Sequence, residues 1–297
     1  MSLVINHNLM AMNAARNLSQ SYGNLATSTR RLSSGLRVGT AADDAAGLAI
    51  RELMRADIAS LNQGMRNAND AISMIQTADG ALQVIDEKLI RMKELAEQAA
   101  TGTYTSDQRL IIDSEYQAMA SEITRIANAT DFNGIYLLNG NLSSSVHDGT
   151  GLTSTGRLKV HFGAGNDSAE DYYYIQIGNS TASALGVGNQ TDPTRGGFSI
   201  STQQAAQTAL DAINQAIVSK DKIRASLGAL QNRLENTITN LSIQAENLQA
   251  AESRVSDVDV AQEMTEFVRN QILTQSAVAM LAQANQLPQM AMQLMQG

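Results

Sequence analysis

The stretch DDAAGLAIRELMRADIASLNQGMRNANDAISMIQTADGALQVIDEKLIRMKELAEQAA (43–100) decides the fold. Its apolar residues recur at alternating steps of three and four, which is typical of a helix that shares a seam with another helix. The steps run from Ile58 to Ile75, are expected to slip near Gly80, and resume from Leu82 to Ala99. One helix over this stretch would be roughly 85 Å long at 1.5 Å per residue. The sequence therefore predicts a rod rather than a globule.

Local signals place further helices on either side of this stretch. Gly35 is expected to end a first helix, and Asp43-Asp44 suit the start of the second because carboxylates stabilise helix N-termini. Thr105-x-x-Gln108 resembles a capping box, so a third helix should fold back antiparallel on the second. The seam expected in the first helix contains Leu18, Tyr22, Leu25, Thr29, Leu32 and Leu36.

The middle of the chain has a different pattern. Asn133-Gly134 is a turn signal, and over 135–200 the apolar period falls towards two. Residues 158–162 and 173–177 fit the two strands of a β-hairpin. Helical periodicity returns after Ser201-x-x-Gln204 and continues to about Ala251, and Ser256-x-x-Asp259 suggests the start of a last helix. The predicted fold is mainly α: a long antiparallel coiled-coil rod of N- and C-terminal segments with a small central β-hairpin region.

The composition narrows the possible functions. The chain has 297 residues, of which 17% are charged and 4% aromatic, with a formal net charge of −8 and no cysteine. Negative charge argues against nucleic acid or an anionic membrane as the main partner. The three histidines (His7, His147 and His161) lack metal-ligand spacing, so we expect no metal, no cofactor and no catalytic site. No secretory signal peptide and no apolar run of the ~20 residues needed for membrane insertion is apparent.

The two ends of the chain carry opposite charge. Residues 1–42 contain four arginines and no acid, whereas 252–297 contain five acids and two arginines. The simplest packing therefore brings the two ends side by side. After Arg269 there is no ionisable side chain, and many apolar residues alternate with glutamines.

Such an apolar tail could pack against its own chain or against other copies. We favour the second arrangement, because two terminal helices without a third partner bury only one stripe each. Head-to-tail contacts between open surfaces give a helical filament. The residues expected in this assembly core are Leu18, Tyr22, Leu25, Leu32, Met264, Phe267, Val278, Leu281, Leu287 and Leu294.

Several motifs together identify a resemblance to the bacterial flagellins. RLSSGLRV (31–38), RNANDAISMIQTADGAL (66–82) and DFNG (131–134) resemble their N-terminal region. ASLGALQNRLENTITNL (225–241) and AQANQLPQ (282–289) resemble their C-terminal region. The resemblance implies a filament subunit exported through the flagellar type III apparatus to the outside of the cell. It also implies a flagellar cap, hook-junction proteins and an export chaperone as partners. A hook–filament junction protein is the alternative.

The resemblance also divides the chain into domains. It implies an inner terminal-helix domain of 1–42 and 254–297, which would form the filament core, and a rod domain of 43–253. Many flagellins carry large outer domains after the hairpin, but here the hairpin region, about 135–200, leads almost directly into the returning helix. We therefore expect a short form without a large outer domain.

Two further roles follow from the resemblance. LIRMKELAEQ (89–98) and DSEYQAMASEI (113–123) resemble the segments through which flagellins engage the Toll-like receptor that senses them. Arg91, Leu95 and Glu115 occupy the positions of the receptor-contacting residues, although Arg91 and Glu115 could be ordinary solvated charges and Leu95 a seam neighbour. Some flagellins are O-glycosylated on exposed hydroxyls. The candidate acceptors are Ser143, Ser144, Ser145, Ser180, Thr181 and Ser183.

Overall fold

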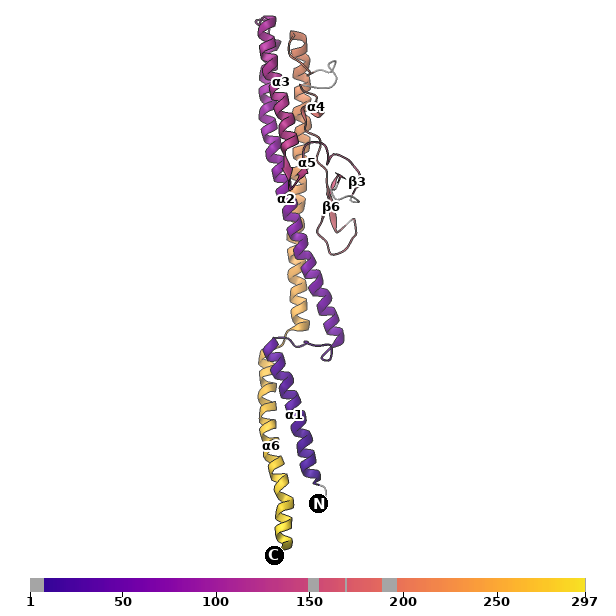
Figure 1. The fold of residues 1–297 in the computed structure, drawn as a ribbon, viewed down its shortest axis with the longest axis vertical. Helices are drawn as coiled ribbons and strands as arrows, with labels where there is room; N and C mark the ends of the chain where they lie inside the picture. The colour runs from indigo at the N-terminus through magenta and orange to yellow at the C-terminus, as the bar shows by residue number, and fades with distance from the viewer. Residues whose placement is uncertain (1–7, 149–154, 169, 189–196, 297) are drawn as a thin grey trace. The chain divides into compact units, whose positions relative to one another are not determined.

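The structure, a computed structural model, describes residues 8–148, 155–168, 170–188 and 197–296, without the side chains of 155, 287–289 and 291–296. It confirms the predicted mainly helical fold with small hairpins (Figure 1). The helices are α1 (Leu9–Ser34), α2 (Ala45–Ala100), α3 (Ser106–Ala129), α4 (Ala182–Leu185), α5 (Gln203–Ser256) and α6 (Val260–Gln296). The strands are β1 (Asp131–Phe132), β2 (Ile135–Tyr136), β3 (His147–Asp148), β4 (Thr155–Gly156), β5 (Leu158–His161) and β6 (Tyr172–Ile175).

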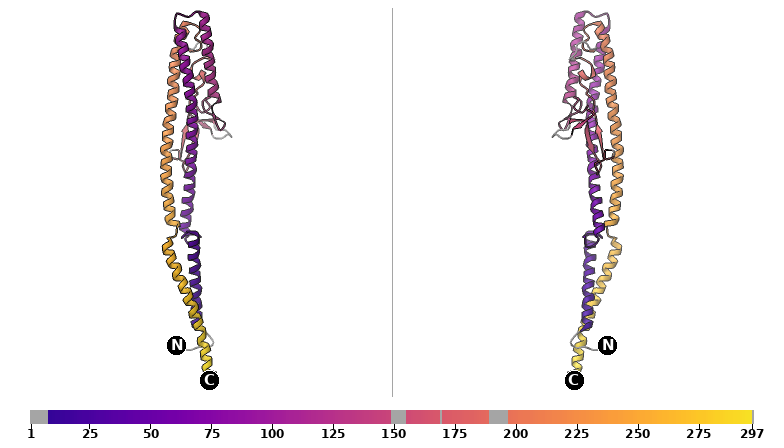
Figure 2. Two further views of the ribbon diagram at one scale, coloured as in Figure 1. Left: turned by 90° about the vertical axis from the view of Figure 1, so that its left-hand side faces the viewer. Right: turned by 90° about the vertical axis from the view of Figure 1, so that its right-hand side faces the viewer.

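The chain forms two compact units. Unit 1 comprises Met1–Ile58 and Glu246–Gly297, and unit 2 comprises Ala59–Ala245. Helices α1 and α6 pack side by side in unit 1, as the opposite charges of the two ends predict. In unit 2, α3 and the adjoining parts of α2 and α5 surround the hydrophobic core (Figure 2). The domain boundaries expected at 42/43 and 253/254 concern the assembled filament and stay a prediction.

The inward-facing row of α2 is continuous, so the expected slip near Gly80 is wrong. Buried positions follow one another in unbroken steps of three and four. They are Leu61, Gly64, Ala68, Ala71, Ile75, Ala78, Leu82, Ile85, Leu89, Met92, Ala96 and Ala99. Small residues occupy several of these positions, and the larger Met65 and Ile72 are only partly buried. The spacing of the large side chains alone therefore does not reveal the seam at the positions where small residues are buried.

Helix ends follow the predicted signals in some places and not in others. Thr105 and Gln108 form the expected capping box, and Gly35 ends α1 in the left-handed conformation with φ 73°. Asp44 accepts a hydrogen bond from the Gly47 amide at 2.9 Å near the start of α2. Helices α5 and α6 begin later than the predicted start signals at Ser201 and Ser256. Thr202 Oγ1 caps α5 and Asp259 Oδ1 caps α6, because these side chains accept from the first free amides of each helix.

The predicted hairpin is confirmed and packs against α2. Strands β5 and β6 are antiparallel, with Lys159 opposite Tyr174 and His161 opposite Tyr172. Their inner face contributes Val160 and Ile175 to the core. Gly64 permits the approach, because a Cβ atom there would lie 1.9 Å from the Phe162 carbonyl oxygen. The turn predicted at Asn133-Gly134 is also present, between β1 and β2.

Two ion pairs join α2 to α5 across the core of unit 2. Lys220, which is 1% exposed, donates to Asp86 at 2.5 Å and pairs with Asp221 at 2.7 Å. Arg224 donates to Asp79 at 2.7 Å, and this hydrogen bond raises the pKa of the guanidinium. The lysine occupies a position of the α5 seam, which the sequence did not predict.

Candidate assembly surface

The inner seam between α1 and α6 combines half-buried leucines and one phenylalanine with small and polar residues. The row of α1 that is buried or half-buried consists of Ala11, Ala14, Leu18, Ser21, Leu25, Ser28 and Leu32. The corresponding row of α6 consists of Phe267, Asn270, Thr274, Ala277, Leu281 and Ala284. Both rows keep steps of three and four, yet Ser28, Asn270 and Thr274 are among the buried polar residues. The small and polar members reduce the apolar area that holds the two helices together.

Sequence periodicity misplaced part of the α1 seam. Tyr22 and Thr29 were expected to face inwards, but both are exposed, and Ser21 and Ser28 occupy the inner positions instead. The sequence pattern favours the larger side chains, whereas close packing of two helices favours the serines. Tyr22, which is 53% exposed, therefore lies on the outer surface of the pair.

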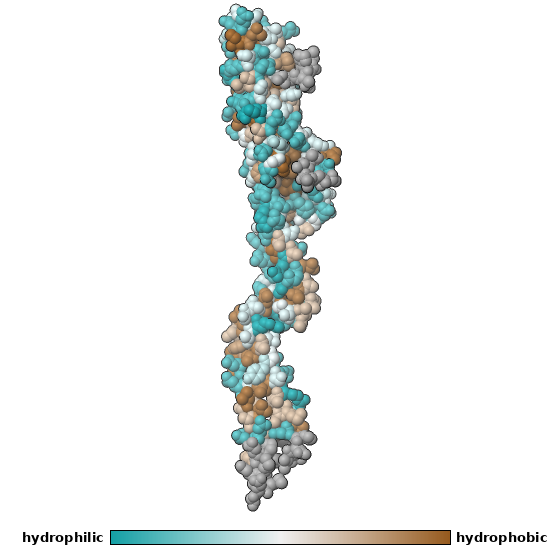
Figure 3. Space-filling view, in the orientation of Figure 1, coloured by the Kyte–Doolittle hydropathy of each residue, from teal (hydrophilic) through white to brown (hydrophobic). Residues whose placement is uncertain are grey.

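The outer surface of the α1–α6 pair is unusually apolar. Figure 3 shows apolar residues spread over this part of the molecule. The large apolar side chains exposed here are Leu9, Met10, Met12, Tyr22, Val260, Met264, Val268, Ile272, Leu273, Val278, Met280 and Met290. Among the described residues of unit 1, the buried hydrophobic residues are Val38 and Ala284. A helix with apolar residues around its circumference is normally buried on several sides.

Polar contacts join the two terminal arms, which are α1 with the segment after it and α6 with the segment before it. The Val258 amide donates to the Gly35 carbonyl at 3.0 Å, and the Arg37 amide donates to the Ser256 carbonyl at 2.7 Å. Arg31 approaches Glu263 at 3.5 Å, with side chains 30% and 12% exposed. Further along the pair, Asn8 Nδ2 donates to the Ala284 carbonyl at 2.7 Å. These contacts fix the register of the arms but add little stability, since exposed ion pairs are worth ~0–1 kcal/mol.

The predicted assembly residues fall into three groups. Five are half-buried and lie in or beside the seam: Leu18, Leu25, Leu32, Phe267 and Leu281. Three are exposed on the outer surface: Tyr22, Met264 and Val278. The side chains of Leu287 and Leu294 lie outside the described residues. The first group can hold the arms together, and the second is open to a partner.

The three receptor-contact candidates have different surroundings. Arg91 donates to Glu115 from Nε at 3.1 Å and from Nη2 at 2.8 Å, and to Glu94 at 2.9 Å. The bonds to Glu115, and then those to Glu94, raise the pKa of Arg91. Leu95 is only 1% exposed and belongs to the hydrophobic core. The structure thus brings Arg91 and Glu115 together at the surface, while Leu95 lies beneath it.

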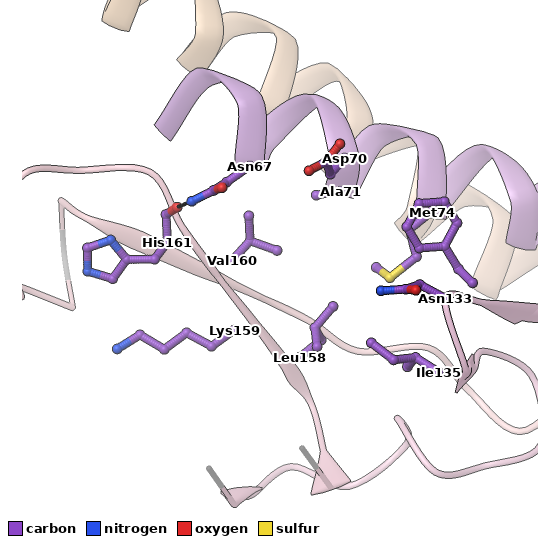
Figure 4. Close-up of a pocket in the computed structure, with 11 residues that line it drawn as sticks. Asn67, Asp70, Ala71, Met74, Asn133, Ile135, Leu158, Lys159, Val160 and His161 are labelled. Carbon is purple, nitrogen blue, oxygen red and sulfur yellow. Dashed lines mark hydrogen bonds between the residues drawn. The ribbon is translucent and has the colours of Figure 1, made fainter. Parts of the chain in front are cut away.

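A hollow of about 380 Å³ lies between α2 and the hairpins of unit 2 (Figure 4). Met74 and Val160 contribute to its apolar lining, and Asp70, Asn133 and Lys159 to its polar lining. Asn67 donates to the His161 carbonyl at 2.8 Å and holds the hairpin to the helix beside it. In the part of the chain that is described, no group of three or more metal-binding side chains is present. The described residues that line the hollow therefore form no such metal-binding group.

The glycosylation candidates differ in accessibility. Ser143, Ser144, Ser145 and Ser183 are exposed and Thr181 is half-buried, with its hydroxyl capping the short helix α4. Ser180 is 0% exposed, so its hydroxyl is inaccessible to a glycosyltransferase in the folded chain. Whether any of them is modified stays a prediction.

No described helix has the length and apolar character required to cross a bilayer.

Comparison with known proteins gives consistent matches along the chain. Residues 5–143 match the bacterial flagellin N-terminal helical region, and residues 210–295 match the bacterial flagellin C-terminal helical region. The flagellar filament 33 kDa core protein of Treponema phagedenis is 42% identical, over 99% of this chain and 100% of that protein. A flagellin of Halalkalibacterium halodurans is 43% identical over the same shares. The crystal structure of Bacillus cereus flagellin, 28% identical, covers 63% of this chain and 94% of that chain with a TM-score of 0.46.

Proposed function

This chain belongs to the bacterial flagellin family, and we propose that the apolar outer surface of its α1–α6 pair joins one copy to the next in the flagellar filament. The chain is a structural subunit of that filament and not an enzyme. None of the relatives reported above favours a hook–filament junction protein. What carries the proposal is the exposure of large apolar side chains on both terminal helices.

The seam and the outer surface together explain why assembly is favourable. Small and polar residues interrupt the apolar side chains of the seam and make the isolated pair marginal, because helices in water depend on packing an apolar face. Sister copies that cover Ile272, Val278 and Met280 would remove apolar area from water and offset the cost of ordering both arms. Unassembled copies would then keep unit 2 folded while their terminal segments are mobile. In the filament the inner domain would consist of 1–42 and 254–297, and the rod domain of 43–253.

Seeded elongation tests this mechanism. Removal of residues 270–297 should leave a soluble chain that does not lengthen filament seeds, as measured by sedimentation and electron microscopy. In the full-length chain, Ile272→Ser with Val278→Ser should also prevent elongation, because both side chains are about half exposed on α6. Val84→Ser with Val218→Ser makes the same chemical change at exposed positions of unit 2 and should elongate. Sedimentation of the truncated chain with the seeds would refute the mechanism.

The same apolar surface suggests what accompanies the chain before assembly. An export chaperone would cover α6 and keep it from premature association, and the flagellar cap and hook-junction proteins would meet the same terminal helices at the filament ends. Export through the flagellar type III apparatus would place the filament outside the cell. Support for these partners comes from family membership and from the exposed residues of α6.

We also propose recognition by the flagellin-sensing Toll-like receptor through Arg91 and Glu115. The observation that favours it is the exposed, mutually bonded arrangement of these two side chains on α2 and α3. Leu95 supports them from the core, so its substitution would disturb folding as well as contact. Receptor-reporter signalling by Arg91→Ala with Glu115→Ala should fall at least tenfold. Glu266→Ala with Arg269→Ala removes another exposed ion pair, on α6 and outside both segments, and should signal like the parent. Equal signalling by both variants would sink the assignment.

A further inference from the structure

The outer face of the β5–β6 hairpin gathers aromatic rings and cations. In the antiparallel register, Leu158, Val160, Tyr173 and Ile175 point to the core, and the alternate residues Lys159, His161, Tyr172 and Tyr174 share the other face. Tyr172 and Tyr174 meet edge to face at 5.4 Å between ring centroids. His161 stacks on Tyr172, and His147 of β3 lies against Tyr174. The result is a row of four aromatic rings on one face of the hairpin.

Two cations are seated on this row. Lys159 Nζ lies 3.6 Å from the centroid of the Tyr172 ring, and Arg157 Cζ lies 3.8 Å from that of Tyr174. Among the described residues, neither cation forms an ion pair with a carboxylate. Arg157 Nε has no hydrogen-bond partner in the described part of the chain, and the single polar contact of Lys159 there is with Asn166 at 3.5 Å. Lys220 and Arg224 at the α2–α5 contact, by contrast, pair with aspartates.

The nearby carboxylates of Asp70 and Asp171 form no ion pair with these cations. Asp171 accepts hydrogen bonds from the amides of Gly165 and Asp167 within the hairpin turn. Asp70 lies on α2 among the residues that line the hollow. Two positive charges therefore remain available on a surface of half-exposed rings and hydroxyls. Ring faces favour such cations at exposed sites by ~0.5–1 kcal/mol, which holds both side chains in place.

We propose that this hairpin face binds an acidic polysaccharide, with sugar carboxylates at Arg157 and Lys159 and sugar hydroxyls at Tyr172 and Tyr174. Arginine and lysine are the natural partners of a carboxylate. A polymer with widely spaced carboxylates suits the site better than nucleic acid for two reasons. The chain as a whole carries −8, which repels a densely charged polyanion. Cations already cover faces of both tyrosines on which a base would stack.

Binding of hyaluronan, in which carboxylates alternate with neutral sugars, tests the proposal with the full-length chain as monomer and as sedimented filament. The parent should bind at low salt and lose affinity as salt rises. Arg157→Gln with Lys159→Gln should lower the affinity about fivefold, since two surface charge contacts are lost. Lys88→Gln with Lys222→Gln makes the same change of net charge on the helices and should bind like the parent.

Charge-conserving and competing probes complete the test. Arg157→Lys with Lys159→Arg should retain binding, which separates loss of charge from loss of hairpin structure, and circular dichroism checks the fold of each variant. Neutral dextran should not bind. Absence of hyaluronan binding by the parent, or an equal loss in the helix control, overturns the proposal. Tighter binding of a single-stranded DNA oligonucleotide through Arg157 and Lys159 would overturn it in favour of a nucleic-acid site.

Discussion

Units 1 and 2 are both built from long helices, but they place their apolar side chains in opposite ways. In unit 2 the row from Leu61 to Ala99 of α2 is buried among α3, α5 and the hairpin. In unit 1 the helices meet through half-buried leucines and a phenylalanine interspersed with serine, threonine, asparagine and alanine, while Ile272, Val278 and Met280 face outwards. Periodicity is equally regular in both units. The difference shows that helical spacing specifies a seam, and that the residues in the seam decide whether one chain can complete it.

This contrast assigns different tasks to the two units. Unit 2 is stabilised by its own core, by the capping box at Thr105 and by the Asp86–Lys220 pair. Unit 1 exposes the apolar surface that we propose neighbouring copies cover, and a few polar contacts, such as Asn8 to Ala284, set its register. Under this proposal, unit 2 is folded before assembly, whereas the terminal helices become ordered when copies join.

The largest difference between the two units should appear in the amide hydrogen exchange of the unassembled chain. Amides of α2 around Leu89 should exchange only through global unfolding, whereas those of α6 around Val278 should exchange through local opening. The two opening free energies should differ by at least ~5 kcal/mol. Exchange in polymerised filaments provides the control, because both regions should then be protected. Strong protection of α6 in the free chain would remove the distinction between the units.

Truncation of a buried leucine to alanine should reveal a smaller difference between the units, in the free energy of unfolding. Leu89→Ala removes a fully buried side chain of unit 2 and should lower the free energy of unfolding by about 2–5 kcal/mol. Leu25→Ala makes the same change in the half-buried seam of α1 and should cost the free chain less than about 1 kcal/mol. Urea unfolding followed by circular dichroism measures both. Similar losses would mean that the α1–α6 pair already forms a true core.

The sequence predicted most helices and the β5–β6 hairpin because their signals are local. Gly35 and the pair Thr105/Gln108 act within one helical turn, so their roles could be recognised without the fold. Gly64 and Lys220 could not be placed this way. Each is explained by a distant partner, the Phe162 carbonyl for the glycine and the Asp86 carboxylate for the lysine.

The candidate sites show the same limit. Arg91 and Glu115 are polar and were expected at the surface, where they lie. Leu95 continues the helical pattern beside them, but its burial depends on how α3 and α5 pack over that turn of α2, which spacing alone does not specify. The outward orientation of Tyr22 likewise follows from the close approach of α1 and α6, which selects Ser21 and Ser28 for the inside.

Ion pairs offer a third comparison, with a smaller expected effect. Asp86→Asn leaves the buried Lys220 ammonium with the exposed Asp221 as its remaining carboxylate partner, and should destabilise unit 2 by about 1–3 kcal/mol. Glu263→Gln removes the longer contact with Arg31 in unit 1 and should change stability by less than about 1 kcal/mol. Thermal unfolding of both variants and the parent measures the two losses of stability. An equal or larger effect of Glu263→Gln would show that charge, rather than apolar surface, organises unit 1.

The smallest effect should be an acid-sensitive loosening of the loop before α2 in unit 1. Thr40 donates to Asp43 from its hydroxyl at 2.8 Å and from its amide at 3.0 Å, and Arg30 lies 2.6 Å from the same carboxylate. The Thr40 hydroxyl bond and the other contacts lower the pKa of Asp43 below its ordinary value of 3.8. Because the folded pKa is depressed, the stabilisation is present above that value and is lost as the pH falls through the lower, folded pKa.

The loop at Thr40 should accordingly open in strong acid, before unit 2 unfolds, and its opening should follow the titration of Asp43. The NMR signal of the Thr40 amide is the appropriate probe, since global stability will hardly change for so exposed a group. Asp43→Asn should abolish the acid-dependent step and leave the loop equally loose at all pH values. A Thr40 signal that moves with pH in that variant as in the parent would assign the step to another acid. The contacts between Thr40 and residue 43 would then not depend on the ionisation of Asp43.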